Sequence, residues 1–356
     1  MARRVARSLD VLLGQLNGRF PDRSKASDGG IGDAAHAARV SDHNPDSGGV
    51  GRARDFTHDP AHGVDIDRLS DEIAASRDPR IKYCVTPETR VLCADLHWRP
   101  ISEITVGQSL IAFDEYGPDR KTGVLECTGA RMRTAYTESF QVIPKQCYEI
   151  ITDRGTVTAS GDHMWLQADF YQRSYRKWTK VADLVAEDEI QYFADPWEMQ
   201  TTFDAGWLAG LFASAGRLTK VGKTWTLGIP QREDAVLDRA KDILSVFKIE
   251  SFIDKSGLNT RNLHIRGDLP ELLRFLGTVP TTRLYHKAVH ESQLWDGSRI
   301  NGSWPVATVR EVQPVGLREV IAMQTSTRTF IAEGMFSHNC IANNLKAHLA
   351  ARSPDG

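Results

Sequence analysis

Several features are scarce or missing in this sequence of 356 residues, and each absence excludes a class of protein. No run of about 18 apolar residues occurs, so we expect no transmembrane helix and no membrane association. Neither sign of charge is in excess, because 44 Lys and Arg oppose 46 Asp and Glu. This balance argues against a protein that coats nucleic acid, although it leaves room for a local basic face.

Cysteine is also scarce, and no obvious secretion signal is present. The start, Met1 to Arg4, resembles the basic end of a signal peptide, but Asp10 and Gly14 interrupt the apolar stretch that should follow. The cysteines are odd in number and form no C-x-x-C pair, which argues against a zinc ribbon and a disulfide framework. We therefore expect free thiols and synthesis in the cytoplasm. The five are Cys84, Cys93, Cys127, Cys147 and Cys340.

The character of the sequence changes along the chain, and the order of the changes predicts a nested organisation. Residues 1–83 contain helical patterns at 9–16 and 65–76, and residues 340–356 have the same character. Residues 84–202 and 301–339 consist of short β-branched runs separated by turns, which predict a mainly β fold. Residues 203–300 between them predict an inserted α+β module.

An internal repeat lies within the β region. Residues 98–113 and 178–193 align without a gap, with tryptophans, aliphatic positions and a polar turn in the same places. Two copies of one supersecondary unit predict a pseudo-twofold β fold. The region 301–339 adds predicted strands at 307–309, 319–323 and 329–332.

The start of the β region carries residues for an acyl shift. The Cys84 thiol can attack the carbonyl of Tyr83 and move that acyl group from nitrogen to sulfur. The step is uphill unless other groups protonate the leaving nitrogen and stabilise the oxyanion. Ser160 and His163, three positions apart, have the right chemical types for this task.

The end of the β region carries residues for release. The Cys340 thiol can take the acyl group by thioester exchange. The side-chain nitrogen of Asn339 can attack its own carbonyl and cleave the chain before Cys340. His338 can assist by polarising that carbonyl or by moving the proton.

In this combination, Cys84, the Ser160-x-x-His163 block and His338-Asn339-Cys340 resemble the splicing blocks of an intein. The stretch 329–339 resembles the C-terminal block as a whole, and the resemblance covers 84–339. It implies the hedgehog/intein horseshoe fold and self-splicing in cis, with no cofactor or partner. Ser160 stands where the family usually has Thr, and keeps the hydroxyl. Arg328 and Thr329 stand where many members have Asp or His.

The inserted module contains a second motif. Residues 208–216, Leu-Ala-Gly-Leu-Phe-Ala-Ser-Ala-Gly, resemble the LAGLIDADG helix of homing endonucleases. The resemblance places metal-binding acids where this chain has Ala213 and Ala215, and neither can bind a cation. We expect a degenerate endonuclease without nuclease activity. Residual DNA binding would use basic residues that are otherwise a solvated face: Lys220, Lys223, Arg232 and Arg261.

The flanking segments, 1–83 and 340–356, would form one small host protein once joined. Ser41-x-His43 followed by Asp55 resembles the zinc site of D-Ala-D-Ala carboxypeptidase and phage endolysin peptidases. The resemblance implies His43 and Asp55 as zinc ligands and peptidoglycan as the partner of the spliced host protein. His348, the only histidine after Cys340, lies in no ligand motif, so a third ligand is not identified. A product acting on the cell wall would need its own route of export.

Two other readings stay open. The main hypothesis is a precursor that splices itself. The first alternative is a zinc-dependent cell-wall peptidase with an inert β insertion, and the second is an active nuclease. Cys84 alone is typical of a buried structural cysteine, and His338-Asn339 alone is typical of a polar turn. Zinc content, wall hydrolysis and magnesium-dependent DNA cleavage discriminate among the three.

Overall fold

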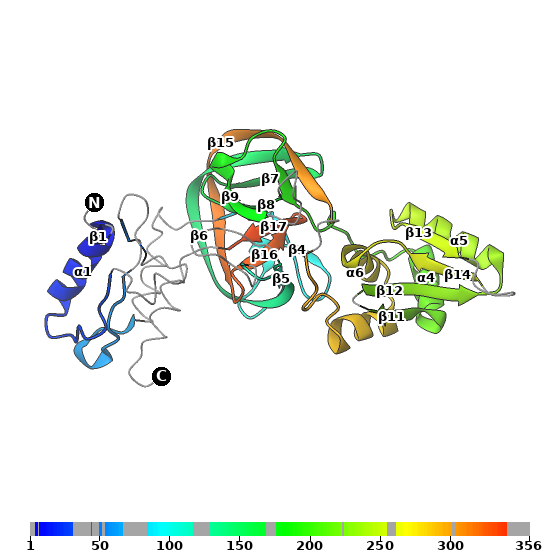
Figure 1. Ribbon diagram of the computed structural model, residues 1–356, viewed down its shortest axis with the longest axis horizontal. Coiled ribbons are helices and arrows are strands. Elements are labelled where there is room, and N and C mark those ends of the chain that lie inside the picture. Colours follow the sequence, from blue (N-terminus) through cyan, green and yellow to red (C-terminus); the bar gives the residue numbers. More distant parts are fainter. Residues whose placement is uncertain are drawn as a thin grey trace.

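The computed structural model describes residues 4–5, 7–30, 44, 50–51, 54–66, 84–116, 129–168, 176–222, 224–254, 261–300 and 304–339. Figure 1 shows them as an N-terminal lobe, a β body and an α+β module. The described chain is mainly β, as predicted. Within these ranges no helix has both the length and the apolar content to span a membrane.

The N-terminal lobe is small. Helix α1 is longer than the predicted helix at 9–16, and the predicted helix at 65–76 falls outside the described residues after Ile66. Leu16, Phe56, Val64 and Ile66 form its core. Its elements are β1 (Arg4–Val5), α1 (Arg7–Arg19), β2 (Val50–Gly51) and η1 (Pro60–His62).

The β body is built on one sheet of eleven strands. The strand order is β4-β3-β16-β17-β8-β10-β15-β6-β5, with β7 paired to β6 and β9 paired to β8. All its strand pairs are antiparallel. The elements are β3 (Arg90–Leu92), β4 (Trp98–Pro100), η2 (Ile101–Glu103), β5 (Ser109–Phe113), β6 (Met132–Thr152), β7 (Gly155–Ser160), β8 (Met164–Ala168), β9 (Arg176–Lys180), η3 (Val181–Asp183), β10 (Glu189–Gln191), β15 (Val306–Thr325), β16 (Thr329–Ala332) and β17 (Met335–His338).

The two longest strands, β6 and β15, correct one prediction. The sequence predicts separate strands at 307–309 and 319–323, but the structure has a single strand through both. Pro314 and Gly316 lie between the two predicted strands, at a register shift in the pairing with β6. A bulge accommodates both residues without ending the strand, because it leaves one residue unpaired and bends the ladder.

The predicted repeat is confirmed by the local structure. Both copies run strand, single 3₁₀ turn, strand, and η2 and η3 lie 80 positions apart. Gly107 and Glu187 occupy equivalent turn positions, with φ of 84° and 70°. The next residues, Gln108 and Asp188, each accept a hydrogen bond from the backbone N–H three residues earlier, at 3.2 and 2.9 Å.

The segment 203–300 forms its own sheet, with strand order β11-β12-β14-β13, and has helices close to the ranges that the sequence pattern predicts, 205–215, 233–247 and 269–276. Strand β11 was not predicted, because it is short and mostly exposed. The elements are α4 (Phe203–Ala215), β11 (Arg217–Val221), β12 (Thr224–Gln231), α5 (Asp234–Val246), β13 (Ser251–Asp254), β14 (Arg261–Ile265), α6 (Leu269–Thr278), α7 (Thr282–Tyr285) and the π-helical η4 (His286–Glu291).

One hydrophobic core joins this module to the β body. The same buried cluster includes Leu96 of the β body and Leu276 of α6. Trp197, in the connection before α4, donates from Nε1 to the Leu96 carbonyl at 2.9 Å. Tyr285 of α7 donates from its hydroxyl to the Asp95 carbonyl at 3.0 Å. The module is therefore attached by packing as well as by its two chain connections.

Candidate active site

Cys84 is fully buried at the edge of the β body, beside the end of β7. Val85 bridges Ala159 and Ile321, so the chain enters between β7 and β15. The backbone N–H of Ser160 donates to the Cys84 carbonyl at 2.9 Å. These bonds hold residue 84 next to the block predicted to act on it.

Ser160 contacts the nitrogen of the Tyr83–Cys84 bond. Its Oγ accepts from the Cys84 N–H at 3.2 Å and donates to Asp162 Oδ1 at 2.7 Å. Lys145 of β6 donates from Nζ to Asp162 Oδ2 at 3.2 Å. Because the Asp162 carboxylate only accepts, the Ser160 hydroxyl proton points toward it and the oxygen lone pairs face the amide. The sequence analysis did not identify Asp162 or Lys145.

His163 connects this block to the C-terminal strand. It is fully buried, and its Nε2 lies 3.0 Å from Oγ of Ser337 in β17. The Ser337 hydroxyl donates to the His338 carbonyl at 3.3 Å, so Nε2 of His163 is the donor in the first contact. The structure therefore brings the segment around Ser160 and the segment ending at Asn339 together.

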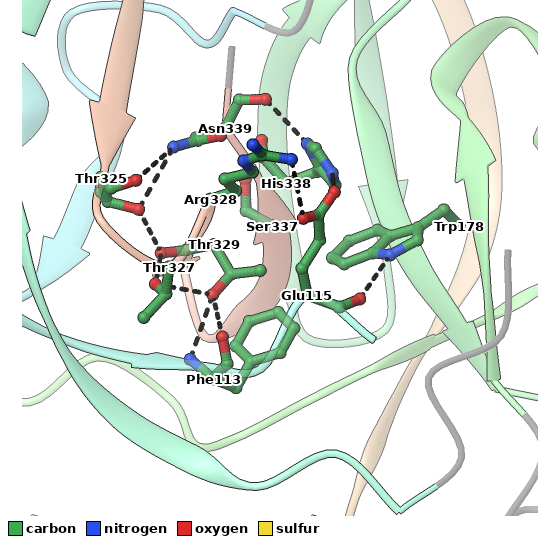
Figure 2. Close-up of polar contacts among 10 residues, drawn as sticks. All are labelled: Phe113, Glu115, Trp178, Thr325, Thr327, Arg328, Thr329, Ser337, His338 and Asn339. Carbon is green, nitrogen blue, oxygen red and sulfur yellow. Dashed lines mark hydrogen bonds and ion pairs between the residues drawn. The ribbon is translucent and has the colours of Figure 1, made fainter. Parts of the chain in front are cut away.

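Asn339 is held by both its backbone and its side chain. Its N–H donates to the Arg328 carbonyl at 2.9 Å, continuing the β16–β17 hairpin. Its Nδ2 donates to the carbonyl and to Oγ1 of Thr325, each at 3.2 Å. A carbonyl can only accept, so the amide cannot be turned over, and the nitrogen faces Thr325 (Figure 2).

His338 lies against the carbonyl of the last described peptide unit. Its Nδ1 is 2.8 Å from the Asn339 carbonyl oxygen, and its Nε2 is 3.1 Å from Glu115 Oε1. Trp178 meets the ring edge-to-face, with 4.8 Å between ring centroids. Figure 2 shows the ring of His338 between Asn339 and Glu115.

Glu115 is a third residue that the sequence did not point to, and no local signal could have found it. It follows β5, whose last residue, Phe113, donates its N–H to Thr329 Oγ1 at 3.1 Å. Trp178 Nε1 donates to the Glu115 carbonyl at 3.0 Å. Arg328 Nη1 lies 3.4 Å from Glu115 Oε2. Despite the opposing effect of burial, the bond and charge of His338, with the charge of Arg328, lower the pKa of the Glu115 carboxyl.

The remaining predicted thiols divide into two groups. Cys93 and Cys147 are buried and free, as expected for core residues, and burial raises the pKa of Cys147 to about 11. Cys127, Cys340 and Tyr83 lie outside the described residues.

The predicted zinc ligands are not placed together by the described residues. His43, Ser41 and His348 lie outside them, and Asp55 is buried with its backbone paired to Gly29. Among the residues with described positions, no group of three or more His, Cys, Asp or Glu is arranged to hold a metal ion.

Two of the basic residues predicted for residual DNA binding have contacts within the module. Arg261 pairs with Asp234 at 3.1 Å, and Lys220 lies over the Trp225 ring at 5.6 Å. Arg232 follows β12, and Lys223 is outside the described part. Helix α4 ends at Ala215, so Ala213 and Ala215 occupy its last turn.

No model of a known protein family and no curated protein matches this chain. Solved structures similar to it include a DnaB intein from Synechocystis sp. PCC 6803, at 10% identity and a TM-score of 0.34, covering 72% of this chain and 97% of that one. The gp41-1 intein gives 9% identity, a TM-score of 0.30, and coverage of 72% and 98%. The DnaX mini intein from Spirulina platensis has 10% identity and a TM-score of 0.31, and the match covers 72% of this chain and 99% of that one.

Proposed function

We propose that residues 84–339 excise themselves and join residue 83 to residue 340. The observation that carries this proposal is the contact of His338 Nδ1 with the Asn339 carbonyl while Thr325 holds Asn339 Nδ2. An Asn side chain and an imidazole on one carbonyl are the groups that cleavage by Asn cyclisation needs.

The first step is an acyl shift at Cys84. The thiol attacks the Tyr83 carbonyl, and the bond from that carbonyl to the Cys84 nitrogen breaks. The thiol proton passes to that nitrogen as it leaves, and Ser160, which accepts from the Cys84 N–H and donates to Asp162, holds the nitrogen in place during the step. His163 is assigned to the same step from its spacing to Ser160.

The later steps release and join the products. The Cys340 thiol takes the acyl group from Cys84 by thioester exchange. Asn339 Nδ2 then attacks its own carbonyl carbon and closes a succinimide, the bond to the residue 340 nitrogen breaks, and a proton passes from Nδ2 to that amine. The freed amine finally attacks the Tyr83 thioester and forms the peptide bond. No cofactor, energy source or partner is consumed.

Intact mass spectrometry of the purified full chain tests the proposal. We expect two species, residues 84–339 ending in a succinimide or its hydrolysis product, and residues 1–83 joined to 340–356. Cys84→Ala should prevent ligation, and Asn339→Ala should prevent release of 340–356. Persistence of only the intact chain under folding conditions would contradict the proposal.

For the inserted module we infer a structural remnant without nuclease activity, because the side chains of Ala213 and Ala215 offer no carboxylate to a metal. Magnesium-dependent cleavage of any DNA by the purified chain would overturn this inference. Residual DNA binding by the module, and wall hydrolysis by the joined host segments, are separate activities for which the described residues supply no assembled site.

A further inference from the structure

The contacts of His338 fix its protonation state. Nδ1 faces the Asn339 carbonyl at 2.8 Å, and Nε2 faces a Glu115 carboxylate oxygen at 3.1 Å. A carbonyl oxygen and a carboxylate oxygen both accept and neither donates, so both ring nitrogens must donate. The ring is then an imidazolium. The alternative with the same number of protons is a neutral ring beside a protonated Glu115, and the Arg328 guanidinium 3.4 Å from the other Glu115 oxygen favours the ionised carboxylate instead.

Burial makes the carboxylate necessary. The His338 side chain is 3% exposed and that of Glu115 is 16% exposed. A buried cation is costly unless an opposite charge and hydrogen bonds compensate it. The charged or titratable groups around the pair are Arg328, on the far oxygen of Glu115, and Tyr116, whose side chain hydrogen-bonds the same carboxyl.

From this arrangement we propose that Glu115 is a positioning residue that keeps the His338 ring doubly protonated and turned toward the Asn339 carbonyl, so that release of residue 340 depends on it. The inference rests on the proposed splicing function. It assigns to Glu115, which lies two residues after β5, a role that follows neither from the resemblance nor from the junction residues.

The chemistry follows from charge development. When Asn339 Nδ2 attacks, the carbonyl oxygen gains negative charge, and the charged donor at Nδ1 stabilises it. Thr325 accepts both Nδ2 hydrogen bonds, which makes that nitrogen richer in electrons. As the carbonyl re-forms, the bond to the residue 340 nitrogen breaks and that nitrogen gains the proton lost by Nδ2. Glu115 remains a carboxylate throughout and never contacts the reacting atoms.

The test measures release of 340–356 from the full chain carrying Cys84→Ala, so that only cleavage after Asn339 contributes. Adding Glu115→Gln keeps the shape but removes the charge. We expect release to fall about 10- to 100-fold near neutral pH, and the basic limb of the rate profile to move about one to three pH units toward acid. Glu115→Asp should restore much of the rate and the parent profile. Glu103→Gln, an exposed acid at the end of η2, is the matched control and should leave both unchanged.

The outcomes separate the two proposals. If the Cys84→Ala parent releases nothing at any pH, the splicing function itself fails. If the parent releases 340–356 while Glu115→Gln has the parent rate and profile, only the role of Glu115 is overturned. Glu115→Gln could instead lower the release rate by the same factor at every pH, with no recovery in Glu115→Asp. That result would show that Glu115 has only a structural role, and would also overturn the inference.

Discussion

Individual side chains at the two junctions are oriented by hydrogen bonds whose donors and acceptors are fixed by chemistry. Asp162 and Thr325 are the clearest examples, because each accepts from a residue assigned to the reaction. A carboxylate orients the Ser160 hydroxyl, and a backbone carbonyl orients the Asn339 amide. Removing one of these hydrogen-bonding atoms should therefore slow the one reaction step in which its residue is proposed to act.

The first prediction concerns Ser160→Ala. In the full chain carrying Asn339→Ala, loss of the hydroxyl should slow release of residues 1–83 by dithiothreitol about 10- to 100-fold, because the Cys84 nitrogen loses its polar partner. Release is followed by mass spectrometry. Thr156→Ala removes an exposed hydroxyl from the same strand and should have no effect. Equal rates for the two variants would exclude Ser160 from the step.

Cys147 gives a prediction about pH. With a pKa of about 11 this thiol is protonated at pH 8, and only about one molecule in a thousand carries the thiolate. We expect Cys147 to resist iodoacetamide in the folded chain and to react quickly in urea. Peptide mapping after brief labelling checks this. Fast labelling of the folded chain near pH 8 would show that Cys147 is neither buried nor protonated.

At the scale of secondary-structure elements, the two copies of the repeat form the same turn with different residues. In the repeat, one copy uses Gly107 and the other uses Glu187 at the same left-handed position. A residue other than glycine costs about 1 kcal/mol or more there, because its Cβ approaches a backbone oxygen. Glu187 is tolerated, and its exposed side chain reaches Arg310 at 2.7 Å.

Gly107→Ala should therefore destabilise the chain by about 1 kcal/mol, although no atom beyond its own chain neighbours lies within 4 Å of the added Cβ. Gly206→Ala is the matched substitution, equally unobstructed but inside helix α4, and should stabilise by up to about 1 kcal/mol. Both are compared by urea denaturation of the chain made inert with Cys84→Ala and Asn339→Ala. The same sign for both changes would contradict the backbone explanation.

Across the whole molecule, the β body and the inserted module share one core. Gly277 of α6 is the closest point of contact, since a Cβ there would lie 2.0 Å from Trp197 Nε1 and 2.8 Å from the Leu96 carbonyl. Shared burial of this kind couples the unfolding of two parts. We expect the β body and the module to unfold in a single transition.

Gly277→Ala tests this coupling. The better helix propensity of alanine is worth about 1 kcal/mol, but displacing Trp197 and its bond to Leu96 should cost more. We expect net destabilisation of about 2 kcal/mol, seen equally by tryptophan fluorescence and by circular dichroism in urea. Gly210→Ala, with open space around it, serves as the control. Separate transitions for the two probes in the inert parent chain would show that the parts unfold independently.

Sequence by itself determined the mainly β character, the repeat, and the residue types at both junctions. Periodicity, turn residues and short motifs act over a few positions, so they can be read without a fold. The length of β15 was misjudged because Pro314 and Gly316 are also the residues that end strands.

Only the tertiary structure decided which side chains meet. Glu115 lies 223 positions from His338, and Lys145 reaches Asp162 from another strand. A contact of this kind leaves no period and no local composition in the sequence, because it depends on where β5, β6 and β17 are placed by the sheet. The chemical type of each junction residue could therefore be read from the sequence, whereas its hydrogen-bond partner was decided by folding.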